Sequence, residues 1–180
     1  MIFIVVVAAM SMALRCDEGV YMAIISIVSS ITMITLFIVS FLYTCKMDRA
    51  LDNAIMMSKK HFSMFYIVNR WLEAKQQGKC MDIYLKKNGF HTVAIYGMHY
   101  IGERLYRELE DTQVEVLYGI DKNKDGCNCP ITIYKPNDEL PIVDAIIVTT
   151  PLYYYPIKRI LNEKLGVPII FILDVVECME

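Results

Sequence analysis

Residues 91–102 read HTVAIYGMHYIG, and this stretch decides the fold of the C-terminal half of the chain. Residues 91–96 have the apolar and β-branched character of a strand. A turn from Gly97 to Gly102 follows directly, and a helical segment over residues 103–110 comes next. A strand that passes through such a turn into a helix presents free N–H groups and the positive end of a helix dipole, which attract anions.

Downstream of this turn, strands and helices continue to alternate. Residues 114–120 (VEVLYGI) form a predicted second strand, residues 131–134 a short third, residues 143–149 an almost wholly apolar fourth and residues 168–173 (PIIFIL) a fifth. A predicted helix over residues 154–165, closed by Gly166, separates the last two strands. This alternation predicts an α/β fold: a small doubly wound, Rossmann-like parallel sheet of about five strands in the order 3-2-1-4-5.

The glycine turn indicates a nucleotide site. In dinucleotide-binding folds the first glycine makes the tight turn, the second admits the pyrophosphate and the third lets the helix pack closely. His99 takes the middle position here, so a phosphate must lie farther from the backbone or accept a hydrogen bond from the imidazole. Asp121 closes the second strand, where an acid binds ribose hydroxyls. The predicted binding residues are Gly97, Met98, His99, Tyr100, Ile101, Gly102, Asp121, Lys122, Thr149, Thr150 and Pro151. The alternative is a tight turn with no ligand and a solvated Asp121.

The N-terminal part of the chain indicates a membrane anchor. The chain is 56% hydrophobic, above the roughly 45 to 50% of soluble domains. Residues 20–44 contain no charge, glycine or proline. As a helix they exceed the roughly 30 Å of a bilayer core. Lys46, Arg49, Lys59 and Lys60 follow this segment, whereas Arg15 alone precedes it. The positive-inside rule therefore places the C-terminal domain in the cytoplasm, at the cytoplasmic membrane.

Within the predicted anchor, residues 1–45, a second apolar run covers residues 1–14. It is short for a membrane span. A first helix over residues 2–14 would make a hairpin with residues 20–44, whereas a cleaved signal would leave the same cytoplasmic C-terminus.

Residues 46–90 are predicted to form a helical linker to the domain, residues 91–180. Residues 46–77 lack internal glycine and proline, and Gly78 predicts the end of the helix. A short helix over residues 80–88 ends at Gly89. One apolar stripe recurs at helical spacing: Met47, Leu51, Ile55, Phe62, Phe65 and Leu72. Two interpretations stay open. The helix packs on the domain or on a second copy as a homodimer, or it lies on anionic lipid.

Three segments carry a family resemblance: residues 96–102 (YGMHYIG), 118–121 (YGID) and 143–151 (VDAIIVTTP). Together they resemble the Rossmann domains of bacterial polysaccharide-biosynthesis proteins, a group that includes membrane-bound nucleoside-diphosphate-sugar epimerases and dehydratases. The last segment also resembles the strand-four motif of glucose-fructose oxidoreductase-type domains, where a Thr-Pro pair lies beside NAD(P). The resemblance covers residues 92–175 and implies binding of NAD(P) or a sugar nucleotide. It also implies a truncated form, without the catalytic region of those enzymes.

Other patterns in the chain do not predict chemistry. Tyr154 and Lys158 match the Tyr-x-x-x-Lys pair of short-chain dehydrogenases but open a helix after the fourth strand, and are expected on its surface. The calcium-like run from Asp121 to Gly126 has Thr132 where a bidentate Glu is needed. Cys127 and Cys129 lack the further ligands of a zinc site. His61 and His91 are expected to be ordinary surface or packing residues. No metal is therefore expected, and the net charge of -2 does not favour nucleic acid as a partner.

Two functions remain. The first is a membrane-anchored protein that binds NAD(P) or a sugar nucleotide and acts in bacterial cell-surface polysaccharide biosynthesis, with membrane lipid, nucleotide and a glycan-assembly enzyme as partners. The alternative is a non-catalytic interaction or regulatory module with a degenerate Rossmann core. No catalytic residues are predicted.

Overall fold

The structure is a computed structural model that describes residues 6–7, 18–123, 126 and 129–179. It divides into two compact units, Met1–Ile55 and Met56–Glu180. Of the expected first helix over residues 2–14, only Val6 and Val7 lie within the described residues, and both are helical.

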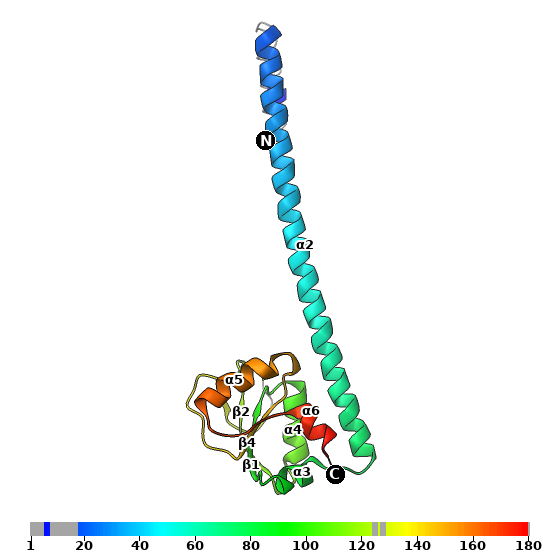
Figure 1. Ribbon diagram of the computed structural model, residues 1–180, viewed down its shortest axis with the longest axis vertical. Coiled ribbons are helices and arrows are strands. Elements are labelled where there is room, and N and C mark those ends of the chain that lie inside the picture. Colours follow the sequence, from blue (N-terminus) through cyan, green and yellow to red (C-terminus); the bar gives the residue numbers. More distant parts are fainter. Residues whose placement is uncertain (1–5, 8–17, 124–125, 127–128, 180) are drawn as a thin grey trace. The chain divides into compact units, whose positions relative to one another are not determined.

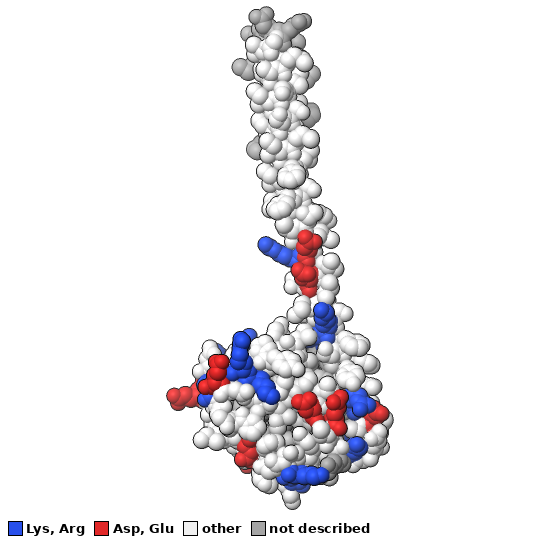
Figure 2. All heavy atoms as spheres, viewed as in Figure 1, with Lys and Arg blue, Asp and Glu red and all other residues white. Residues whose placement is uncertain are grey.

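Helix α2 (Glu18–Gln76) joins the two segments that were expected as separate membrane and linker helices into one helix. No glycine or proline interrupts residues 20–77, so nothing in the backbone forces a break. Its most apolar 18-residue window has a mean hydropathy of 2.4 and is 0% buried. Figure 2 shows no charged side chain along this stretch on the face drawn. The helix is thus long and apolar enough to cross a membrane.

The second unit contains the predicted parallel sheet (Figure 1). Its strands are β1 (Thr92–Tyr96), β2 (Glu115–Ile120), β3 (Ile133–Tyr134), β4 (Ala145–Val148) and β5 (Ile169–Phe171). All neighbours pair in parallel, and the order is β3-β2-β1-β4-β5. The predicted strand order is confirmed. The helices are α3 (Met81–Lys87), α4 (Tyr100–Leu109), the short 3-10 helix η2 (Pro151–Tyr153), α5 (Tyr154–Lys164) and α6 (Ile172–Glu177).

Several element ends differ from the expectation. Helix α4 begins at Tyr100 rather than at residue 103, β3 begins at Ile133 rather than at residue 131, and β4 covers Ala145–Val148 rather than residues 143–149. The predicted fifth strand, residues 168–173, stops at Phe171, and Ile172 begins α6, which was not predicted. Gly166 does not close α5, because Leu165 is already extended. Gly78 and Gly89, by contrast, take left-handed φ values of 78° and 80° and follow the ends of α2 and α3 as predicted.

Helices cover both faces of the sheet. On one face, α3, α4 and α6 bury their apolar side chains against Val93 and Ile95 of β1 and Ile147 of β4. On the other face, α5 packs Ile157 and Leu161 over β4 and β5. The strands alternate their side chains between these two cores, as period-two geometry requires.

The last turns of α2 belong to the first of these cores. Ile67, Trp71 and Ala74 are buried with α3 and α4, and Lys75 forms a 2.6 Å ion pair with Glu108 of α4. The hydrogen bond from Lys75 to Glu108 raises the lysine pKa. The helix therefore packs on the domain, and the compact unit begins at residue 56, within the predicted linker.

This packing uses a face of α2 that differs from the predicted stripe. All members of that stripe are exposed in the single chain: Met47, Leu51, Ile55, Phe62, Phe65 and Leu72. Homodimer contact and lipid contact through the stripe both remain predictions.

Candidate functional site

The candidate site lies where the connections from β1 and β4 leave in opposite directions. Helix α4 links β1 to β2 over one face of the sheet, and α5 links β4 to β5 over the other. The carboxyl ends of β1 and β4 therefore bound a topological switch point, the usual ligand crevice of open parallel sheets. The single Thr149 hydroxyl proton closes this edge in a bifurcated hydrogen bond, with the Gly97 carbonyl oxygen at 2.5 Å and the Tyr96 carbonyl oxygen at 3.1 Å.

The two predicted glycines each occupy a place that excludes a side chain. Gly97 has a φ of 93°, and a Cβ there would lie 2.7 Å from Thr150 Cγ2 and 2.8 Å from Thr149 Oγ1. A Cβ on Gly102 would lie 2.2 Å from the Gly97 carbonyl oxygen. The first glycine thus makes the tight turn and the second lets α4 approach β1, the roles expected of the outer glycines.

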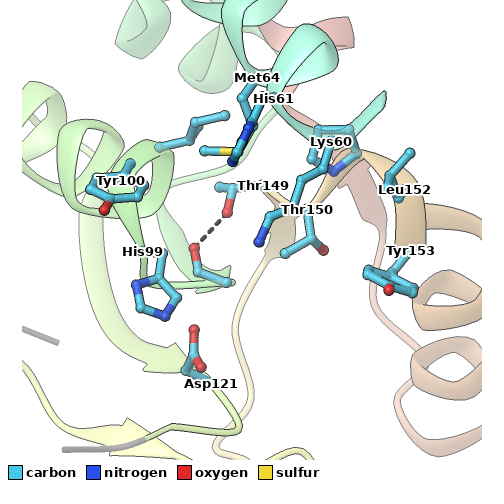
Figure 3. A pocket seen from close by; sticks show the side chains of 13 residues that line it. Lys60, His61, Met64, His99, Tyr100, Asp121, Thr149, Thr150, Leu152 and Tyr153 are labelled. Atoms are coloured by element: carbon cyan, nitrogen blue, oxygen red, sulfur yellow. Dashed lines mark hydrogen bonds between the residues drawn. The ribbon is translucent and has the colours of Figure 1, made fainter. Parts of the chain in front are cut away.

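His99, at the middle position of the turn, has a φ of -73° and a ψ of -159°, an ordinary extended conformation. The backbone therefore does not require glycine at this residue. Its imidazole lines the site beside Asp121 (Figure 3). The N–H groups of the first turn of α4, which begins at Tyr100, have no intrahelical acceptors and carry the positive end of the helix dipole.

Asp121 is buried rather than solvated, at 9% exposure. One carboxylate oxygen accepts a 2.8 Å hydrogen bond from the Met98 N–H, and the other a 2.9 Å bond from the Asn123 N–H. The Met98 side chain is buried away from the site and packs against Gly119. A Cβ added to Gly119 would lie 2.5 Å from Met98 Cγ. Asp121 therefore holds the glycine turn in place, and each oxygen retains further acceptor capacity.

A first cavity of about 240 Å³ lies over the glycine turn. It gathers predicted residues with side chains from α2 and η2, as Figure 3 shows. Its lining residues are Lys60, His61, Met64, Gly97, His99, Tyr100, Ile101, Asp121, Thr149, Thr150, Pro151, Leu152 and Tyr153.

A second cavity of about 420 Å³ adjoins the first. The two share Gly97, His99, Asp121, Thr150 and Tyr153. The second cavity adds Tyr96, Lys122, Pro136, Asn137, Pro156, Ile157, Ile160 and Leu161. Burial, and then the charge of Asp121, raise the pKa of Tyr96, so its phenol stays protonated at neutral pH.

Most of the predicted residues thus come together at one edge of the sheet, where they line one or both cavities. Two predicted residues line neither cavity. Met98 is a core residue and Gly102 a packing position. Sequence reasoning missed the α2 contribution, because Lys60 and His61 lie far upstream of the glycine turn and carry no motif. His61, expected to be an ordinary surface or packing histidine, lines the first cavity. Tyr153 and Leu152 could have been found, because they follow the predicted Thr-Thr-Pro segment directly.

The patterns that were set aside fall elsewhere. The surface interpretation of the Tyr154 and Lys158 pair is wrong for Tyr154, which is buried and donates to the Ile169 carbonyl at 3.3 Å. The Lys158 ammonium donates to the Tyr154 hydroxyl at 3.0 Å. Neither residue lines the two cavities, so the pair does not face the proposed ligand. Asp125 and Cys127 lie outside the described residues.

The chain matches no protein-family model, no curated protein and no solved structure. What the domain binds must therefore be inferred from the site itself.

Proposed function

We propose that the unit Met56–Glu180 is a Rossmann-like domain that binds a nucleotide, NAD(P) or a sugar nucleotide, across the glycine turn. The observation that carries this proposal is that two cavities meet over Gly97, at the switch point between β1 and β4. Their volumes of about 240 and 420 Å³ compare with roughly 300 to 1,000 Å³ for small-molecule sites. A pair of joined cavities suits an extended ligand with a phosphate near its middle.

The linings suggest how such a ligand lies. The second cavity has an apolar wall of Ile157, Ile160 and Leu161, which suits a base. Asp121 lines both cavities and can accept hydrogen bonds from ribose hydroxyls with its remaining lone pairs. The first turn of α4 then faces the phosphate.

The same proposal places residues 20–44 of α2 in the cytoplasmic membrane. Their side chains are almost all exposed, so they need an apolar environment that the described part of this chain does not supply. A reporter fused after Glu180 should be active on the cytoplasmic side, because the basic residues follow the apolar segment. Activity of an exported reporter would contradict this orientation.

The resemblance to polysaccharide-biosynthesis proteins supports a role in assembling cell-surface glycans. It makes sugar nucleotides the first ligands to test, beside NAD and NADP.

Native mass spectrometry of the full chain, purified in detergent, tests the proposal by detecting a retained nucleotide. Calorimetric titration with NAD, NADP and UDP-glucose then measures affinity. Binding of at least one of them is expected. If the folded protein retains no nucleotide and gives no heat with NAD, NADP or UDP-glucose, a non-catalytic interaction module becomes the better-supported function. The engagement of Asp121 by two backbone N–H groups favours that second candidate.

A further inference from the structure

We infer that the ligand carries a diphosphate group and that Lys60 of α2 binds it directly. This inference rests on the proposed function and deepens it, because it assigns the phosphate contact to a helix that lies outside the sheet and its glycine turn. It also excludes free bases and nucleosides as the natural ligand.

The position of Lys60 is set by the packing of α2. Met64 and Ile67 lie four and seven residues after Lys60 and therefore on the same side of the helix. Ile67 is buried in the core and Met64 packs against it, so the rotation of this part of α2 is fixed. Lys60 consequently lines the first cavity, and Figure 3 shows its side chain reaching into it toward the glycine turn.

The Lys60 ammonium has no carboxylate partner within the described residues 18–123 and 129–179. Asp121 lines the same cavity but lies beyond ion-pairing distance and accepts backbone hydrogen bonds instead. A lysine that faces a cavity without a counter-ion leaves its charge available to an anionic ligand.

The Thr150 hydroxyl is a second group that favours an anionic ligand. Thr150 Oγ1 is buried and has no hydrogen-bond partner among the described residues. Thr150 lines both cavities, at the end of β4. A buried hydroxyl without a partner is costly, and a ligand oxygen that accepts from it after a side-chain rotation would remove that cost.

The donors available to a ligand in the first cavity are therefore the Lys60 ammonium, the N–H groups of the first turn of α4 and, after that side-chain rotation, the Thr150 hydroxyl. All three favour an oxyanion with several acceptor oxygens, which is the chemistry of a phosphate or diphosphate. The charge of Asp121 repels such a group, so the phosphates should lie on the Lys60 and Thr150 side and the ribose on the Asp121 side.

The test compares two matched lysine variants of the full chain in an uncharged detergent, which excludes lipid phosphate. Lys60→Gln removes the cavity lysine, and Lys59→Gln removes the same charge one residue away, at an exposed position that lines neither cavity. The probes are ADP and UDP, each beside its nucleoside. Lys60→Gln should weaken both diphosphates by at least about tenfold, the loss of one charge-assisted hydrogen bond. In Lys60→Gln, the affinities for the two nucleosides should stay within about twofold of the wild-type values. In Lys59→Gln, the affinities for all four probes should stay within about twofold of the wild-type values.

Thr150→Val supplies a second, independent readout. It removes the unpartnered hydroxyl and keeps the branched shape, so the free protein should be as stable as the wild type or more so, while the diphosphates bind several-fold more weakly. A merely structural hydroxyl would lower stability and leave the affinities unchanged.

The outcomes separate the two levels of inference. If the wild type binds nucleosides as tightly as diphosphates, or if Lys60→Gln behaves like Lys59→Gln, the diphosphate inference is overturned and the proposed function stands. If the folded wild type binds none of the four probes nor the nucleotides named above, the proposed function fails and the inference fails with it.

Discussion

Replacing Gly102 by alanine should destabilise the second unit, although alanine is the better helix former by about 1 kcal/mol. The added Cβ would lie 2.2 Å from the Gly97 carbonyl oxygen and 3.0 Å from the Gly97 carbonyl carbon, and both are backbone atoms. Helix α4 would have to move by about 1 Å to restore ordinary contact. Such overpacking costs about 3 kcal/mol at the upper end of its usual range, so the net loss should be about 2 kcal/mol. In a unit of this size, that corresponds to a Tm lower by about 8 °C.

Trp71 provides the assay. It is the only tryptophan in the chain, and it is buried in the core of the second unit. Its fluorescence should therefore report unfolding of that unit directly, in the full chain. Gly166→Ala is the matched control, because a Cβ there meets nothing within 4 Å. The control should change the free energy of unfolding by less than about 1 kcal/mol. If Gly102→Ala is as stable as the wild type, the close approach of α4 to the glycine turn is incorrect.

Three further predictions concern other parts of the chain. The backbone N–H groups of Thr92 and His91 lower the pKa of Asp144, so its stabilising effect is present above pH 3.8 and lost as pH falls through the lower folded value. The Tm gap between wild type and Asp144→Asn should therefore shrink in acid, and a pH-independent gap would refute this. His99→Gly should tighten NAD binding measured by calorimetry, because the imidazole occupies the place of the middle glycine; weaker binding would make the imidazole a phosphate ligand. Phe62→Asp combined with Phe65→Asp should make an otherwise dimeric protein monomeric in sedimentation, because both rings are exposed on one side of α2. An unchanged sedimentation profile would rule out this interface.

The sheet was predictable because its signals are local. Each strand is a short apolar run bounded by turn residues, and the glycine turn marks the first βα unit. The end of β5 was less accessible, because residues 169–173 stay apolar across the change from strand to helix. Ile169 and Ile172 are both buried, one against each core, so hydrophobicity alone could not place the boundary.

The rotation of α2 could not be predicted for a related reason. Apolar side chains occur on two sides of its last turns, and the exposed side, with Phe62 and Phe65, is as apolar as the buried side, with Ile67 and Trp71. Periodicity therefore identified an apolar stripe but not the one that contacts the domain. Because the contribution of Lys60 to the cavity depends on this rotation, it followed only from the structure.

The site residues near the glycine turn were accessible from spacing, since parallel strands bring their carboxyl ends to one edge. The hydrogen bonds of Asp121 could not be predicted from spacing. They depend on how the Met98 and Asn123 N–H groups point once the chain has folded, which residue types do not specify.

Hydrogen–deuterium exchange of the full chain, with and without the nucleotide that calorimetry selects, tests the central claim most directly. Binding at the switch point should slow exchange in residues 97–103, at the glycine turn and the start of α4, and in residues 149–154. Both segments contain residues that line the two cavities, whereas the exposed end of α3 near Gly89 should be unaffected. Slower exchange confined to other segments, or none at saturating NAD, NADP and UDP-glucose, would contradict a nucleotide site at this edge of the sheet.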